Sequence, residues 1–185
     1  LANKKWLEDV RQKSGLVENI DIYDGQILGA GIKFKLYPSN DVNQAQLDFK
    51  YKKGSDEIKI INAESHELVS LDLAERKALE KTVIKVLRTR AKEALPVRLA
   101  QIAKLMKADY ESVTIRDTSS RWGSCSSKND INLSLWLMVL PQKLVDYVLV
   151  HELAHTRFKH HGSEFWDEVA IYVPNHKDIR KELKR

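Results

Sequence analysis

The chain has 185 residues, of which 43% are apolar and 31% are charged. These values predict a hydrophobic core and a soluble surface, and no apolar run reaches the roughly 18 residues that a membrane span needs. Lys and Arg outnumber Asp and Glu by 31 to 26, which permits an anionic partner but is also typical of a solvated basic surface. The single cysteine excludes an intrachain disulfide and favours a reducing, cytoplasmic environment.

The first part of the chain is predicted to form one short helix and then several strands. Apolar residues recur at helical spacing between Ala2 and Lys13. From Ile20 to Val69, short runs of alternating apolar and polar residues are separated by turn signals, which predicts an antiparallel β-meander of three or four strands. The most regular runs are Ile32–Tyr37, Ala45–Tyr51 and Glu57–Ile61.

The middle of the chain is predicted to be helical. An apolar stripe runs from Leu73 to Ala94, and Asp72 is a suitable N-cap for that helix. Pro96 interrupts the pattern, so a second helix is expected from Val97 to Met106.

Strands and further helices are predicted for the rest of the chain. The segments are a strand over Val113–Asp117, a loop over Arg121–Asp130, a strand that opens at Ile131, a helix that starts at Pro141, a helix over Ser163–Val173 that Pro174 ends, and a short charged helix or frayed end over Lys177–Arg185. The helix after Pro141 is apolar on most of its faces, which predicts that it lies in a core. Its polar residues therefore require an explanation.

The polar residues that need this explanation are His151, Glu152 and His155. They lie in the sequence HELAH, His151 to His155, within that helix. Positions i and i+4 lie one turn apart on the same face, so His151 and His155 can reach one metal ion at about 2.0–2.1 Å each. Glu152 flanks this pair and can take a proton from a zinc-bound water. Chance produces HExxH in about 1% of chains with this composition. The motif therefore predicts a zinc-dependent hydrolase.

A catalytic zinc needs a third protein ligand, and four residues after the motif are candidates for it. His161 is the first choice, because its spacing from His155 matches the third ligand of the longer HExxHxxGxxH pattern. His160 would serve if the turn slipped by one residue, and Glu164 or Glu168 would serve if the ligand were a carboxylate. His66 and His176 are predicted to be surface residues.

Four further segments of the C-terminal half are informative: RWGSC, LPQKLVDYVLVHELAH, HGSEFW and PNHKDIRKEL. Through these segments the C-terminal half of the chain resembles the YgjP-like (WLM) metallopeptidase family. It implies an α+β, zincin-type fold in which an active-site helix packs under a small mixed sheet, with the substrate cleft at the edge of the sheet. It also implies zinc ligands at His151, His155 and His161, with Glu152 as the catalytic base. We therefore expect residues 1–72 to form a helical and β-rich region and residues 73–185 to form one compact catalytic region.

The RWGSC loop contains further candidate residues for catalysis, substrate binding or packing. Arg121 can stabilise an oxyanion or bind a substrate carboxylate or phosphate, or it can be a structural arginine that ties the loop down. Gly123 is predicted to supply a backbone conformation that other residues resist. Trp122 is interpreted as a packing residue and Cys125 as a small buried core residue.

Two features near the motif concern packing and substrate binding. Phe165 and Trp166 follow His161 closely and are predicted to pin the third-ligand loop to the core. The strand that opens at Ile131 is predicted to offer its edge to an extended peptide.

Three functions compete on these grounds. The first is a monomeric, cytoplasmic zinc metallopeptidase that cleaves a peptide or protein substrate. The second is a zinc-dependent nucleoside triphosphate pyrophosphatase, with Arg121, Arg157 and Lys159 as a phosphate clamp. The third is a protease module that binds nucleic acid through the basic residues between Leu73 and Lys107, although these residues form no single stripe.

Overall fold

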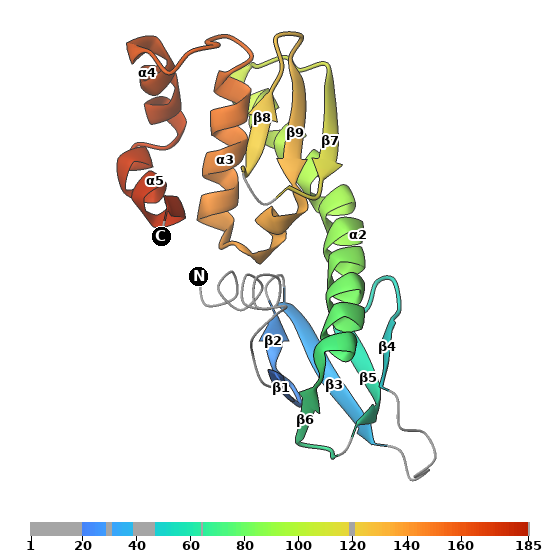
Figure 1. Cartoon of the computed structure of the whole chain (residues 1–185). Coiled ribbons are helices and arrows are strands. Elements are labelled where there is room, and N and C mark those ends of the chain that lie inside the picture. The colour runs from blue at the N-terminus through green and yellow to red at the C-terminus, as the bar shows by residue number, and fades with distance from the viewer. Residues whose placement is uncertain (1–19, 29–30, 39–46, 64, 119–120, 185) are drawn as a thin grey trace. The chain divides into compact units, whose positions relative to one another are not determined.

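The computed structural model describes residues 20–28, 31–38, 47–63, 65–118 and 121–184 (Figure 1). The helix predicted between Ala2 and Lys13 lies outside these residues. The chain divides into two compact units, residues 1–89 and residues 90–185, and the boundary lies within the long helix α2, Leu73–Met106. In the described part of the chain, every helix is too short or too polar to cross a membrane.

The first unit contains two sheets. Strand β1 pairs with β6, and a second sheet has the order β2-β3-β5-β4. The strands are β1, Ile20–Tyr23; β2, Ile27–Leu28; β3, Ile32–Pro38; β4, Asp48–Tyr51; β5, Glu57–Ala63; and β6, Leu68–Leu71. Along β3, Ile32, Phe34 and Leu36 are buried, while Lys33 and Lys35 are exposed. This is the alternation that a half-buried strand requires, and it confirms the strand predicted over Ile32–Tyr37.

The predicted meander is correct in its antiparallel pairs but wrong in one connection. β1–β6, β2–β3 and β4–β5 are antiparallel, whereas β3 and β5 are parallel neighbours, with Phe34 opposite Ile58. β4 lies on the far side of β5 and pairs with it antiparallel, so β5 runs in the direction of β3. Residue alternation reports which face of a strand is buried, and it carries no information about the direction of the neighbouring strand.

Helix α2 is continuous, although two helices separated at Pro96 were predicted. Its N-terminus is capped as expected, because the Glu75 amide donates to Asp72 Oδ1 and the Asp72 amide donates to Glu75 Oε2, at 2.8 and 2.9 Å. Pro96 lies inside the helix, where it removes one backbone donor at a cost of about 3 kcal/mol. The buried residues Leu95 and Leu99 extend one apolar stripe past the proline, so packing offsets that cost.

The second unit combines a small mixed sheet with three helices after it (Figure 1). Its elements are β7, Ser112–Arg116; β8, Gly123–Cys125; β9, Asp130–Ser134; a 3-10 helix, Leu135–Val139; α3, Gln142–Ala154; α4, Ser163–Tyr172; and α5, His176–Lys184. The sheet order is β7-β9-β8, in which β9 is parallel to β7 and antiparallel to β8. Helix α3 packs beside β8 and against α4 and α5. The α+β class and the mixed sheet beside the HELAH helix are therefore confirmed.

The order of this sheet corrects two predictions. Part of the predicted loop Arg121–Asp130 forms β8, because its short polar side chains still allow the backbone to pair with β9. Strand β9, which begins at Asp130, has β7 on one side and β8 on the other, so it has no edge to offer to a peptide. Among the described residues, β8 pairs only with β9, and it is therefore the edge strand next to α3.

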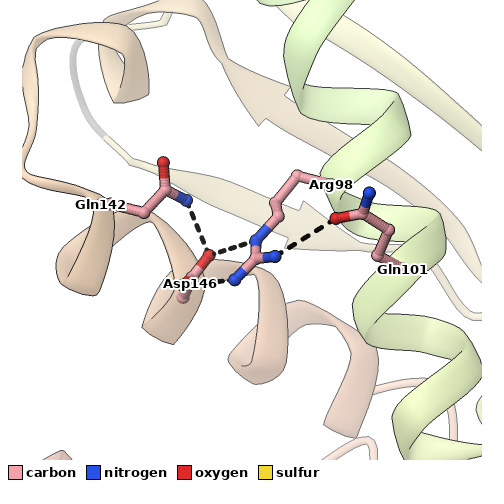
Figure 2. A network of polar contacts seen from close by, with 4 residues as sticks. All are labelled: Arg98, Gln101, Gln142 and Asp146. Carbon is pink, nitrogen blue, oxygen red and sulfur yellow. Dashed lines mark hydrogen bonds and ion pairs between the residues drawn. The ribbon is translucent and has the colours of Figure 1, made fainter.

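An ion pair joins α2 to α3 in this unit (Figure 2). Arg98 Nε and Nη2 donate to the two carboxylate oxygens of Asp146, each at 2.8 Å, and Gln142 Nε2 also donates to Oδ1 at 2.8 Å. Burial raises the pKa of Asp146, but hydrogen bonds from Arg98 and Gln142 outweigh burial and hold that pKa below its usual value. This bidentate pair therefore fixes the first half of the helix that carries HELAH.

Replacing Asp146 with asparagine is expected to lower the free energy of unfolding by about 1 kcal/mol, because the pair is only partly buried. Since the pKa of Asp146 is lowered in the folded state, its contribution is present above the unfolded pKa and is lost as the pH falls below about 4. Urea unfolding at pH 7 and pH 3 measures both effects. A double-mutant cycle with Arg98→Met isolates the pair, and a coupling energy of zero would contradict its role.

Candidate metal site

The site is built at the C-terminal end of α3. The helix buries apolar residues on most sides, so its last turn is held in the core of the unit. His151 and His155 lie on one face there, with ring centroids 4.9 Å apart. This placement is the one that the i, i+4 spacing predicts.

His161 joins this pair from the segment between α3 and α4. Its Nε2 atom lies 3.1 Å from Nε2 of His151. One ligand nitrogen from each of His151, His155 and His161 lies within 4.8 Å of the others. Two nitrogens bound tetrahedrally to one zinc ion would be about 3.3 Å apart, so the three imidazoles need little movement to share an ion. The donor set thus fits a metal.

The other candidates for a third ligand lie outside this cluster. Among the described residues, the group that could hold a metal ion contains only the three histidines. His160 and Glu164 are exposed, and Glu168 is engaged elsewhere because its Oε1 accepts from Arg157 at 2.6 Å.

The surroundings of the three histidines set their hydrogen bonds and their charge. Phe158 O lies 3.0 Å from Nδ1 of His155, which fixes that ring and leaves Nε2 available. Nδ1 of His151 is buried without a partner among the described residues. Burial lowers the pKa of His151 to about 3 and lowers the pKa of His155 and His161. All three imidazoles are therefore neutral at pH 7, which is the form that binds metals.

Aromatic residues of α4 hold the three histidines together. The Phe165 ring is fully buried, and its centroid lies 4.9, 4.6 and 4.7 Å from those of His151, His155 and His161. Trp166 stacks on His161, with centroids 5.5 Å apart and ring planes 21° apart. The predicted role of Phe165 and Trp166 in pinning this segment is consistent with these contacts.

His176, at the start of α5, was predicted to lie on the surface, and this prediction is wrong. Its side chain is buried and stacks on Trp166 at 5.5 Å and 13°. His66 is exposed, as predicted. No local pattern distinguishes these two histidines, because the burial of His176 depends on the packing of α5 against α3.

The Glu152 carboxyl group lies beside the histidines and is almost completely buried. Its Oε2 atom has no hydrogen-bond partner among the described residues. Burial raises the pKa of Glu152 to about 8, although the positive charge of Arg121 acts to lower it. A buried carboxyl with a pKa near neutrality and an unused oxygen is suited to accept and return a proton.

Gly123 on β8 is in direct contact with Glu152. A Cβ atom at Gly123 would lie 2.7 Å from both Cγ and Oε1 of Glu152, which is too close for any real contact. The glycines with positive φ in the described residues are Gly25, Gly31 and Gly54. The prediction that Gly123 supplies a special backbone conformation is therefore wrong, and the glycine is required because it leaves space for the carboxyl group.

The three cations proposed as a phosphate clamp differ in their surroundings. Arg121 is exposed and its side chain forms no ion pair with the described residues, although its charge acts on Glu152. Arg157 binds Glu168 and donates to the carbonyls of Met106 and Lys107.

Lys159 is also engaged within the unit. Its Nζ donates to Ser126 O at 3.0 Å and to the Asn129 side chain. Arg157 and Lys159 therefore tie the segment that carries His161 to the end of α2 and to the β8–β9 turn.

Trp122 and Cys125, the other two residues singled out in the RWGSC loop, are partly buried. Trp122 lies next to β9, since its carbonyl accepts from the Ser134 amide at 2.9 Å. Cys125 is half-buried, and burial raises the pKa of its thiol, so the thiol is protonated at pH 7. Neither residue belongs to the metal-binding group.

A helix that presents two histidines to a third, with a buried glutamate beside them and a mixed sheet alongside, defines a class of metal-dependent hydrolases. Residues 18–185 match the family model described as YgjP-like, metallopeptidase domain, and the chain belongs to this family.

Two solved structures are similar to part of the chain. The metallopeptidase zymogen of Pyrococcus abyssi abylysin is 26% identical, with a TM-score of 0.44, and the match covers 48% of this chain and 90% of that one. The metallopeptidase zymogen of Methanocaldococcus jannaschii jannalysin is 19% identical, with a TM-score of 0.43, over 48% of this chain and 91% of that one. A search of the curated proteins found no match.

Replacing Gly123 with alanine is expected to reduce hydrolysis about 100-fold, because the new methyl group displaces the Glu152 carboxyl by about 1 Å. Zinc content is expected to remain unchanged, since no atom of the three histidines is among the nearest contacts of that methyl. Gly162→Ala is the matched control, because a Cβ at Gly162 meets nothing within 4 Å. Equal activity of the two variants in a hydrolysis assay would contradict the close contact.

Proposed function

We propose that the chain is a zinc-dependent metallopeptidase in which His151, His155 and His161 hold the ion and Glu152 is the general base. The observation that carries this proposal is the cluster of three neutral imidazoles, whose ligand atoms lie within 4.8 Å of one another. Three histidines leave the fourth zinc position open, as catalytic sites require. Family membership supports peptide hydrolysis as the reaction.

The surrounding residues can supply the other parts of hydrolysis. When bound, zinc polarises a substrate carbonyl and makes a bound water acidic. Glu152 Oε2, which has no partner among the described residues, accepts the proton of the attacking water and later returns it to the leaving nitrogen. Arg121 places a positive charge near Glu152 and is our candidate for stabilising negative charge on the substrate.

We propose that the substrate peptide binds along strand β8. It contacts α3 and pairs only with β9 among the described residues. An extended peptide can add to its other side through main-chain hydrogen bonds. Such binding would place the peptide backbone next to Gly123 and therefore next to Glu152.

The pyrophosphatase alternative has less support. A triphosphate needs several cations that converge on one site, but Arg157 and Lys159 already have partners within the unit. Of the three cations, only the Arg121 side chain has neither a hydrogen bond nor an ion pair with the described residues. Nucleic-acid binding through the basic residues of α2 remains a prediction.

A hydrolysis screen tests the proposal. The zinc-loaded protein is incubated with a library of unfolded proteins and with nucleoside triphosphates, and new peptide termini and pyrophosphate are measured. We expect cleaved peptides from the wild type and none from Glu152→Gln. Release of pyrophosphate without any peptide cleavage would overturn the peptidase assignment.

A further inference from the structure

Arg180, on α5, carries a positive charge beside the candidate metal site. The proposed reaction assigns no role to this residue. Its guanidinium carbon lies 5.0 Å from the centroid of the Trp166 ring. Trp166 in turn stacks on His161 at 5.5 Å. Two ring contacts therefore connect the guanidinium group to one of the candidate metal ligands.

Helix α5, which carries Arg180, is anchored on both sides of this residue. One turn earlier on α5, His176 is buried against the same tryptophan, and Ile179 is buried in the core. At the far end of the helix, Glu182 accepts from Lys143 Nζ of α3 at 2.8 Å. Helix α5 is thus held to the helix that carries the HELAH motif.

The guanidinium group itself is exposed and has no internal anion. No carboxylate of the described residues forms an ion pair with Arg180, whereas the neighbouring Lys181 lies 3.8 Å from Asp178. The charge of Arg180 is therefore available to an anionic ligand.

We infer that Arg180 is a specificity-determining residue that binds a carboxylate of the peptide substrate, either an acidic side chain or the C-terminus, close to the scissile bond. This inference rests on the proposed metallopeptidase function. A cation held on an aromatic face keeps its N–H donors free in the ring plane of the guanidinium group, where they can bind a carboxylate through two hydrogen bonds. A single exposed arginine suits a carboxylate better than a triphosphate, because Arg157 and Lys159 are occupied.

Binding of matched metal-chelating ligands tests the inference without requiring catalysis. The probes are the monohydroxamates of succinic, glutaric and adipic acids, and the same molecules with the carboxylate converted to a carboxamide. The hydroxamate group anchors each probe on zinc, and the chain length varies the position of the carboxylate. Isothermal titration of the zinc-loaded protein measures both affinities at low and at high salt.

We expect at least one acid to bind the wild type about 10-fold more tightly than its amide, and this preference to shrink at high salt. Arg180→Met keeps the packing on Trp166 and is expected to abolish the preference while keeping zinc. Arg180→Lys is expected to retain part of it. Lys181→Met, which removes the same charge from the adjacent residue, is expected to retain all of it.

The outcomes separate this inference from the proposed function. Equal affinity of acids and amides for the wild type, or an acid preference that survives Arg180→Met, overturns the inference even if peptides are cleaved. An acid preference that depends on Arg180, without any peptide cleavage, keeps the anion site and overturns the peptidase. Tighter binding of methylenediphosphonate than of every acid, if it is lost in Arg180→Met, assigns the cation to phosphate. If no probe binds, the result contradicts both the metal site and this inference.

Discussion

Glu152→Gln is expected to lower kcat/KM by a factor of about 10² to 10⁴ and to leave one zinc ion per chain in place. The amide has the shape of the carboxyl group but cannot accept a proton. Glu152 is outside the group of three histidines whose ligand atoms converge, so the change removes no candidate metal ligand. Steady-state kinetics and metal analysis by mass spectrometry measure the two effects separately.

Proton release provides a second readout of the same variant. Because burial raises the pKa of Glu152 to about 8, this carboxyl is mostly protonated at pH 7 in the metal-free protein. A divalent cation nearby favours the carboxylate, so zinc binding at pH 7 is expected to release a proton. The release is expected to fade as the pH rises above 8 and to be absent from Glu152→Gln. Calorimetry in two buffers with different ionisation enthalpies measures it.

The control for Glu152 is an exposed carboxyl near the same site. Glu164 lies in the first turn of α4 and outside the histidine cluster, so Glu164→Gln is expected to keep both zinc and activity. A fully active Glu152→Gln variant would show that this carboxyl is not the base. Loss of zinc from Glu164→Gln would instead show that a carboxylate completes the coordination.

The second large effect is expected from His161→Ala, which should weaken zinc binding by more than about 100-fold. The two remaining histidines lie on one helix and can occupy only one side of the ion. His161 also stacks on Trp166, so part of the loss comes from looser packing of this segment. Zinc affinity is measured by competition with a chelator of known affinity.

Thermal unfolding shows the same loss through linkage. A ligand that binds only the folded protein raises the Tm in proportion to the logarithm of its concentration over its Kd. The Tm of the wild type is therefore expected to rise with zinc and to fall with a chelator, whereas the Tm of His161→Ala should change little.

The adjacent residue offers a matched control for this experiment. His160 is exposed and outside the cluster of ligand atoms, so His160→Ala is expected to behave as the wild type. If His160→Ala loses zinc and His161→Ala keeps it, the third ligand is displaced by one residue. If both variants keep zinc, the ligand comes from elsewhere.

The sequence by itself predicted the metal-binding pair and most of the secondary structure. His151 and His155 converge because an α-helix repeats every 3.6 residues, which is a property of local backbone geometry. The N-cap predicted at Asp72 formed for the same reason, and Glu75 completes it with a reciprocal hydrogen bond. The spacing of His161 predicted its approach, although that approach also depends on how Phe165 and Trp166 pack.

Other features of the site were decided only by tertiary contacts. Gly123 lies far from Glu152 in the sequence, and the packing of β8 beside α3 brings its backbone against the carboxyl group. His176 and Arg180 reach the site because α5 packs on α3 and both side chains contact Trp166.

The parallel pairing of β3 with β5 and the continuity of α2 through Pro96 have the same origin. Local patterns report which face of an element is apolar, whereas the neighbour on that face is selected by how the whole unit excludes water and pairs its backbone groups. The sequence therefore determined that the candidate ligands His151 and His155 converge, and the tertiary structure determined the residues that surround them.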